Sequence, residues 1–381
     1  MPRIQSLDPS DKKDFSTLIR FPGEEGNPFD KILRFLEKIN QLPTFIYISL
    51  LLLLNGLLTF NNSDNWVTLS LFSLMDAIII SLLPYLKISF GDVKSQVLLL
   101  ALLRAVFIWL PNPINLVFQF IGTFLVLYGF LYEPSSIAIK TIFREFGEGK
   151  NNVRFLHLTD IHLEELSVRE LKIKRSIEQN PPDFILYTGD FLNLSNTNDP
   201  KSIKQIIDFL NRINSITPLF YVSGSPAVDL KETMEKIQNQ LRATRLDNAN
   251  HLIQINGGTI NLIGITCTHK PQIDILKLEN LIEGNYPNIL LYHSPDLIYE
   301  LSNENNICLM ISGHTHGGQL RFPIFGALFT GSLYGRKLQS GLYQIHDTLL
   351  YISRGIGLEG LGAPRVRFLC KPEIIEWNIE I

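Results

Sequence analysis

Two histidines one residue apart are the clearest candidates for chemistry in this sequence. They lie in the stretch Ser312-Gly-His-Thr-His-Gly-Gly-Gln319, directly after the apolar run Ile307–Ile311. Imidazoles at this spacing, set off by glycines where a buried strand ends, are typical of paired metal ligands. A polar turn with two incidental histidines is the alternative.

Residues of the same kind follow three other apolar runs. The members are Asp160 and His162, Asp190 after Gly189, and His293. Because the carboxyl ends of neighbouring strands meet at one edge of an α/β sheet, we expect this set to converge with His314 and His316. Asp and His together suit Zn, Fe or Mn, and one aspartate can bridge two ions. His157, inside the first run, is expected to be a core residue.

The chain from residue 133 onward has the pattern of an α/β domain that can position these residues. Short runs rich in Val, Ile, Leu and Phe alternate with polar stretches of helical period. Strands are expected at 153–158, 184–188, 219–223, 251–255, 259–265, 288–292 and 307–311, with later ones near 341–345, 349–353 and 373–379. Helices are expected at 168–178, 203–213, 230–241 and 274–282. Long helices fade after residue 300, so mixed sheets are expected.

The first third of the chain is different in character. Four apolar stretches lie at 44–60, 66–86, 96–110 and 114–132. A membrane-spanning helix needs about 20 residues, and most of the stretches approach that length. We therefore expect an N-terminal segment at 1–43, a four-helix transmembrane region at 44–132, and the α/β domain at 133–381.

Lysine and arginine predict the orientation of this region. Seven of them lie between Arg3 and Lys38, and Lys87 and Lys94 lie between the second and third stretches, whereas the other two connections carry none. By the positive-inside rule, the protein is expected to be a multi-pass protein of the cell membrane with its α/β domain in the cytoplasm. The lipid bilayer is thus a predicted partner.

Two features of this region leave alternatives open. Asp76 and Arg104 lie within apolar stretches, so we expect them to pair, either as structural glue or as part of a transport path. The segment 29–42 places apolar residues on one helical face, which suits a helix on the membrane surface or one packed on the α/β domain.

Composition excludes some functions. The 34 Lys and Arg against 37 Asp and Glu give a net charge of -3 and a pI near 6.3, so no basic field indicates nucleic acid as a partner. The three cysteines are too few and too scattered for a disulfide framework.

The order Asp160-x-His162, Gly189-Asp190, His293, Gly313-His314-x-His316 resembles the calcineurin-like metallophosphoesterase family. Several ordered motifs are far more specific than one. Later phrases resemble its membrane-attached bacterial branch: Arg321-Phe-Pro, Ser340-Gly-Leu-Tyr343, Ser353-Arg-Gly-Ile-Gly357 and Arg367-Phe-Leu-Cys-Lys-Pro-Glu373. The resemblance covers roughly residue 134 to the C-terminus and implies a four-layer sandwich of two mixed β-sheets flanked by helices.

The resemblance also implies two divalent metal ions. One would be held by Asp160, His162, Asp190 and His316, and the other by Asp190, His293, His314 and an asparagine, with Asp190, His314 and His316 serving as catalytic residues. The sequence departs from the family motif Gly-Asn-His-Asp, because it reads Gly224-Ser225-Pro226-Ala227. Ser225 is a weaker ligand and Pro226 supplies no proton, so we expect the second metal site to be weakened.

The predicted function is membrane-anchored hydrolysis of a phosphoester or pyrophosphate by metal-activated hydroxide, with a lipid or lipid-linked molecule as a candidate substrate. A positioned acid–base group contributes roughly 10²–10⁴-fold to the rate of such a reaction. Because Pro226 cannot act as one, a catalytically impaired metal-binding scaffold or sensor is the alternative. His269 is a candidate replacement for the missing histidine. Arg354, Arg365 and Arg367 are expected either to bind phosphate or to be solvated charges and surface ion pairs.

Overall fold

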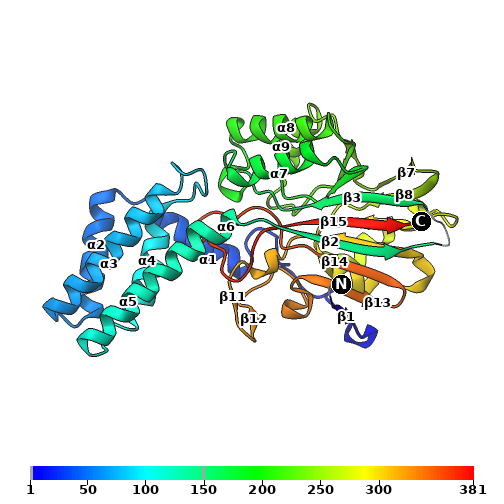
Figure 1. Cartoon of the computed structure of the whole chain (residues 1–381). Helices are drawn as coiled ribbons and strands as arrows, with labels where there is room; N and C mark the ends of the chain where they lie inside the picture. The colour runs from blue at the N-terminus through cyan, green and yellow to red at the C-terminus, as the bar shows by residue number, and fades with distance from the viewer. Residues whose placement is uncertain (1–2, 148–150) are drawn as a thin grey trace.

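The computed structural model describes residues 3–147 and 151–381, and it divides into a helical region and an α/β body (Figure 1). Residues 1–2 of the expected N-terminal segment lie outside the described part. The helices of the first region are α1 (Pro28–Asn40), α2 (Thr44–Leu58), α3 (Ser63–Leu82), α4 (Val93–Ala105) and α5 (Asn112–Val126), and α5 continues through a π-helical segment (Leu127–Tyr132) into α6 (Glu133–Ser135). Figure 1 shows this bundle projecting from one end of the α/β body.

Each of the four expected apolar stretches forms a helix, but the helices differ in length. Those at Ser63–Leu82 and Asn112–Ser135 are long and apolar enough to cross a membrane. The pair α1 and α2 passes the same test only together, with a bend of 112° between them. The structure thus holds two or three candidate spans among the described residues, and the count of four stays a prediction.

The predicted pairing of Asp76 with Arg104 is confirmed. Asp76 is fully buried on α3, and its Oδ1 lies 2.7 Å from Nη2 of Arg104 on α4. The Nε of Arg104 donates to Oδ2 of Asp76, also at 2.7 Å, so the contact is bidentate.

Helix α1 covers part of the α/β body. Its buried side chains include Leu33 and Leu36, whereas Ile32 and Phe35 are exposed. A Cβ added to Gly362 of the α/β domain would overlap Leu36, so the two backbones approach closely. Packing on the α/β domain, one of the two alternatives for this amphipathic segment, is therefore present in the structure.

The α/β body contains two mixed sheets. The six-stranded sheet has the order β2 (Ala138–Glu145), β15 (Glu373–Glu380), β3 (Asn152–Leu158), β4 (Phe184–Tyr187), β5 (Leu219–Tyr221), β6 (Thr244–Arg245). The seven-stranded sheet has the order β1 (Ile4–Ser6), β13 (Gly341–Ile345), β14 (Thr348–Ile352), β10 (Ile307–Ser312), β9 (Asn288–Leu291), β8 (Gly258–Gly264), β7 (Ala249–Ile255). All the strands expected from the sequence are present.

Two apolar layers hold the six-stranded sheet in place. One lies between the sheets, where Phe155 and Trp377 meet Leu291 and Leu309. The other lies between that sheet and the helices α7 (Val168–Gln179), α8 (Pro200–Asn214) and α9 (Lys231–Gln238). The outer face of the seven-stranded sheet packs against short 3-10 helices and loops. The four-layer description stays a prediction.

Two local expectations need correction. The helix expected at 274–282 is a four-residue helix, α10 (Pro271–Asp274), followed by two 3-10 turns. Asp274 is anchored by Thr268 N and Tyr292 Oη, and these bonds hold the segment to the neighbouring loop and strand. Strand β1 was not expected, and it pairs in parallel with β13, so part of the segment 1–43 is built into the α/β domain.

Candidate metal centre

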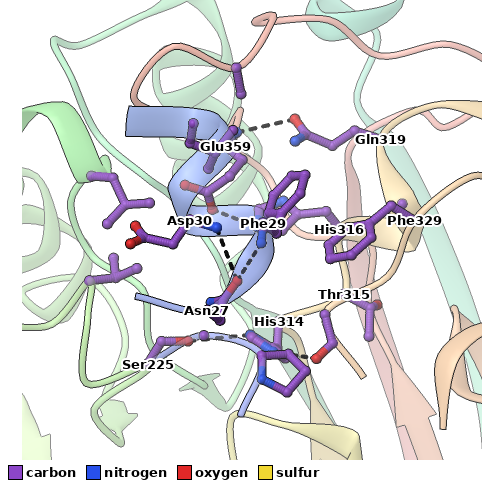
Figure 2. Close-up of a pocket in the computed structure, with 18 of the residues that line it drawn as sticks. Asn27, Phe29, Asp30, Ser225, His314, Thr315, His316, Gln319, Phe329 and Glu359 are labelled. Atoms are coloured by element: carbon purple, nitrogen blue, oxygen red, sulfur yellow. Dashed lines mark hydrogen bonds and ion pairs between the residues drawn. The ribbon is translucent and has the colours of Figure 1, made fainter. Parts of the chain in front are cut away.

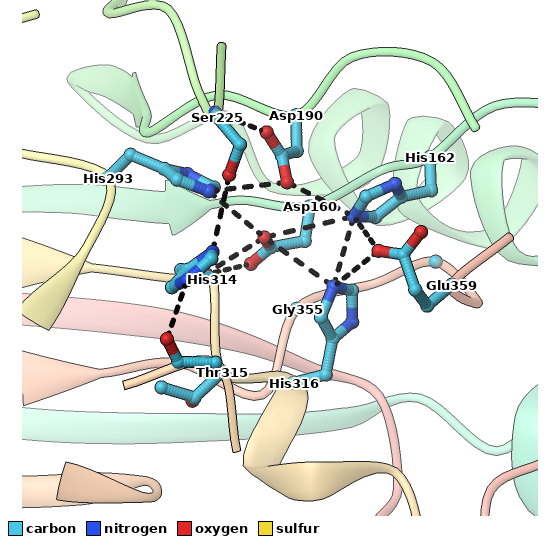
Figure 3. Close-up of polar contacts among 12 residues, drawn as sticks. Asp160, His162, Asp190, Ser225, His293, His314, Thr315, His316, Gly355 and Glu359 are labelled. Carbon is cyan, nitrogen blue, oxygen red and sulfur yellow. Dashed lines mark hydrogen bonds and ion pairs between the residues drawn. The ribbon is translucent and has the colours of Figure 1, made fainter. Parts of the chain in front are cut away.

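Seven predicted positions, spread over more than 150 residues of sequence, converge at the carboxyl ends of the strands (Figure 3). Asp160 and His162 follow β3, Asp190 follows β4, Ser225 follows β5, His293 follows β9, and His314 and His316 follow β10. Six of them form two groups in which the ligand atoms lie within 4.8 Å of one another: Asp160, His162 and His316, and Asp190, His293 and His314.

In the first group, imidazole nitrogens and carboxylate oxygens lie close to one another. Nε2 of His162 lies 3.0 Å from Nε2 of His316 and 3.4 Å from Oδ2 of Asp190. Oδ1 of Asp160 lies 3.7 Å from Nε2 of His316. Asp190 therefore lies beside both groups, as a bridging carboxylate would.

In the second group, the hydrogen bonds of the two histidines show whether a cation fits. Nδ1 of His293 is bonded to the carbonyl of Thr188 at 2.7 Å, while its buried Nε2 has no hydrogen bond and lies 3.2 Å from Oδ2 of Asp190. Nε2 of His314 contacts the carbonyl of Gly331 at 3.0 Å, which leaves Nδ1 directed at the site. A metal-binding histidine usually has this arrangement, with the second ring nitrogen on a carbonyl. The donor set fits a divalent cation.

The backbone is strained at five of the seven positions. Non-glycine residues seldom adopt positive φ, and each such residue costs of order 1–3 kcal/mol, so clusters of them mark functional sites. Glycine at 313 is also required, because a Cβ there would overlap the carboxylate of Asp160. The five positions with positive φ are Asp160 (50°), His162 (43°), Asp190 (57°), His314 (66°) and His316 (51°).

Burial and neighbouring charge shift the acid–base properties of the centre. Burial raises the pKa of Asp160 to about 6. Burial also opposes the charged form of His293, but the carboxylates of Asp190 and Asp160 raise its pKa to about 9. Burial, together with the charge of His293, lowers the pKa of His314 to about 3. A divalent cation would take the place of the proton on His293, because imidazole binds metals in its neutral form.

Two acidic residues of the centre were missed by sequence reasoning. Oε2 of Glu359 lies 3.4 Å from Nε2 of His162 and 3.7 Å from Nε2 of His316, so it adds a carboxylate to the first group. Asp229 accepts hydrogen bonds from Asp190 N and Phe191 N and fixes the Asp190 loop. Both lie in loops without a recognisable ligand spacing, and only the fold brings them here.

His269 lies in the centre as well. Its Nε2 is 3.1 Å from Oγ of Ser225, which in turn is 3.3 Å from Nδ1 of His314. The His269 and His314 rings are 4.5 Å apart, and both face Gly23 of the N-terminal segment, where a Cβ would overlap them. Pro226 is exposed at the rim. The serine at the family's asparagine position thus has a second imidazole beside it.

The three arginines proposed for phosphate have other contacts. Arg365 is buried and pairs with Glu164 at 2.8 Å, and Arg367 is buried and donates to the carbonyls of Arg354 at 2.8 Å and Gly357 at 2.6 Å. Solvated surface charge is therefore wrong for Arg365 and Arg367, whose bonds hold the loops together, while their phosphate role stays a prediction. Arg354 keeps a quarter of its side chain exposed beside Glu373, so its phosphate role stays a prediction.

Comparison with known proteins agrees with this geometry. The family described as calcineurin-like phosphoesterase matches residues 153–318, which include every ligand-type residue described above except Glu359. Residues 153–318 therefore form a calcineurin-like phosphoesterase domain. The expected enzyme class, a metal-dependent phosphoesterase hydrolase, is confirmed at the level of family similarity.

Three relatives show how far the similarity extends. The metallophosphoesterase YkoQ of Bacillus subtilis is 28% identical over 66% of this chain and 94% of its own length. The UDP-2,3-diacylglucosamine pyrophosphatase LpxG of Chlamydia trachomatis is 26% identical over 59% of this chain and 82% of its own. The phosphodiesterase YaeI of Escherichia coli is 29% identical over 58% of this chain and 80% of its own. Each alignment leaves at least a third of this chain unmatched.

Proposed function

We propose that this phosphoesterase is anchored in the membrane and hydrolyses a phosphodiester or pyrophosphate at a dinuclear metal centre. The observation that carries the proposal is the position of Asp190 beside both ligand groups, with the unbonded Nε2 of His293 at 3.2 Å. Shared carboxylates of this kind hold two cations a few ångströms apart in two-metal hydrolases.

The proposed roles follow from the two groups. The first cation would be held by Asp160, His162, Asp190 and His316, with Glu359 as a further carboxylate. The second would be held by Asp190, His293 and His314, with Ser225 as a weak ligand and His269 beside it. When bound, the ions would neutralise phosphate oxygens and activate water for in-line attack. Mn, Fe or Zn suits this mixture of Asp and His.

The N-terminal region is proposed to be the membrane anchor. We retain the expected division at residues 43 and 132, with four crossings and the catalytic domain, taken as a four-layer sandwich, on the cytoplasmic side. Support comes from the two or three candidate spans and from the positive charges on the expected inner loops. The later motifs, which resemble the membrane-attached bacterial branch of the family, also favour an anchor.

The substrate class proposed is an amphiphilic phosphate ester or pyrophosphate. One relative, LpxG, is a pyrophosphatase for a diacylated sugar nucleotide, and another, YaeI, is a phosphodiesterase. A pyrophosphate or an activated diester depends less on leaving-group protonation, which agrees with Pro226 in place of the family's histidine. Nucleic acid is not proposed, because the chain carries no excess of positive charge.

The test is hydrolysis of bis-p-nitrophenyl phosphate by the full chain with Mn²⁺, compared with Asp190→Ala, together with metal analysis. We expect two ions per chain and hydrolysis that depends on Asp190. Equal rates for the two proteins would contradict the proposal. If metal is still bound in that case, the scaffold or sensor alternative, which Pro226 favours, would replace it.

A further inference from the structure

A cavity of about 340 Å³ opens directly beside the metal centre (Figure 2). This volume lies at the lower end of the range of about 300–1,000 Å³ found for ligand pockets. At one end it is lined by Asp190, His314, His316 and Glu359. The remaining wall is mostly apolar and includes Phe29, Leu33, Leu36, Val228, Leu328 and Phe329.

Helix α1 forms the outer wall of this cavity. Asn27 caps the helix by accepting hydrogen bonds from Phe29 N and Asp30 N, and the ring of Phe29 stacks on Phe329 with centroids 4.2 Å apart. Leu33 is 4% exposed and faces inward. The wall is therefore built by packing between the N-terminal helix and the catalytic domain.

The far end of α1 is tied to the helical region. The side-chain oxygen of Asn40 accepts from Ser95 N at 2.8 Å, and Lys94 Nζ donates to the carbonyl of Asn40 at 3.0 Å. After Gln41 the chain bends by 112° into α2. The cavity wall is thus continuous with helices proposed to lie in the bilayer.

Charge and polarity select the chemistry of the occupant. Cations at the centre would attract an anionic group such as a phosphate, while the apolar wall has few polar groups to pair with and favours hydrocarbon. A ligand that satisfies both ends is a phosphate ester with an aliphatic chain. A polar nucleoside in the apolar part would lose its bonds with water without replacement.

We propose that this cavity binds the hydrocarbon chain of an amphiphilic phosphate ester, and that Leu33 on α1 and Phe329 determine its specificity. This inference rests on the proposed hydrolysis at the same centre. The continuity of α1 with α2 indicates that the chain belongs to a lipid and not to a soluble alkyl ester.

The test uses a series of alkyl p-nitrophenyl phosphodiesters, from methyl to octyl, with the full chain in lipid nanodiscs and Mn²⁺. We expect kcat/KM to rise by up to about fourfold for each added methylene until the cavity is full. In Leu33→Trp, where the indole fills the cavity, the ratio of the octyl to the methyl rate is expected to collapse. Phe35→Trp, on the same helix but 62% exposed and outside the cavity, should keep the ratio of the native chain.

A second variant and a binding measurement keep the two proposals separate. If Leu33→Trp does not fold, as judged by its melting temperature, Phe329→Ala should lower the ratio by opening the stacked wall. Hydrolysis with no dependence on chain length, or the same dependence in Leu33→Trp, would overturn the chain site and leave the hydrolase intact. If no diester is cleaved, calorimetry with butyl, hexyl and octyl phosphate decides: affinity that rises with length and is lost in Leu33→Trp supports the chain site, and flat affinity overturns it.

Discussion

The protein buries charge in two places, and the two differ in how fully that charge is bonded. In the helical region, each guanidinium nitrogen of Arg104 donates a hydrogen bond, to Asp76, Gln119 or Thr123. In the metal centre, Nε2 of His293 has no hydrogen bond and lies 3.2 Å from the carboxylate of Asp190, and the backbone is strained at five of the ligand positions. The first cluster is complete by itself, whereas the second is complete only with a cation.

The comparison teaches that burial of charge does not by itself identify a catalytic site. A buried pair whose bonds are satisfied acts as structural glue, and removing one partner leaves an uncompensated charge. A buried polar atom without a hydrogen bond, together with backbone strain, points to a ligand instead. Substitutions in the two clusters should therefore affect different measurements.

The largest effect is expected from Asp190→Ala. Loss of the shared carboxylate removes several kcal/mol of transition-state stabilisation, so hydrolysis should fall at least about 10³-fold. Metal content should fall with it, while the melting temperature of the metal-free chain changes less than in Arg104→Ala. A large loss of stability with retained metal would erase the contrast between the two clusters.

The next largest effect is expected from Arg104→Ala, on stability alone. Asp76 would remain buried without its partner, which costs about 3–5 kcal/mol of unfolding free energy. Activity per folded molecule should be unchanged. The matched control is the double variant Asp76→Leu with Arg104→Leu, which should recover most of the stability, as measured by unfolding in mixed micelles. A double variant as unstable as the single one would show that the pair does more than compensate a buried charge.

A smaller effect concerns pH and tests a buried histidine outside the centre. Burial lowers the pKa of His157 to about 3, from about 6.5 in the unfolded chain, and its Nε2 lies 2.9 Å from Oγ1 of Thr188. Below pH 6.5 the unfolded chain therefore takes up a proton that the folded one refuses, so stability falls as pH falls.

Between pH 7 and pH 5 this residue should cost about 2 kcal/mol, or a melting temperature lower by about 4–8 °C. His157→Gln should remove that part of the pH dependence, because glutamine stays neutral. Scans of both proteins with saturating Mn²⁺ isolate the difference. Equal pH slopes would mean that His157 is charged or accessible in the folded protein.

The smallest effect is expected from restoring the family motif. Ser225→Asn with Pro226→His returns an amide ligand and an acid–base group, and Pro226 is exposed, so a histidine has room. We expect a gain of about tenfold in the rate of hydrolysis of bis-p-nitrophenyl phosphate. This gain is below the roughly 10²–10⁴-fold of a fully positioned group, because Gly23 and His269 already occupy this side of the metal centre. No gain in a folded double variant would mean that β5 does not contribute to catalysis.

The sequence alone was enough for features that have a local signal. The ligand-type residues after β3, β4, β9 and β10 were identifiable because each follows an apolar run. The pairing of Asp76 with Arg104 was predictable because a charge in an apolar helix needs a partner. The departure at Ser225 and Pro226 was visible as a difference in a motif.

Other features depended on tertiary structure. Glu359 lies in a loop with no periodic pattern, and Arg365 and Arg367 look like surface charges until their burial is known. His269 was a candidate from the sequence, but only the fold places it beside Ser225 and His314. The amphipathic pattern of α1 fits a membrane surface and a protein surface equally well, because both need only one apolar face. Contacts between segments hundreds of residues apart decide which surface α1 covers, and hence form the cavity beside the metal centre. No local sequence pattern encodes such contacts.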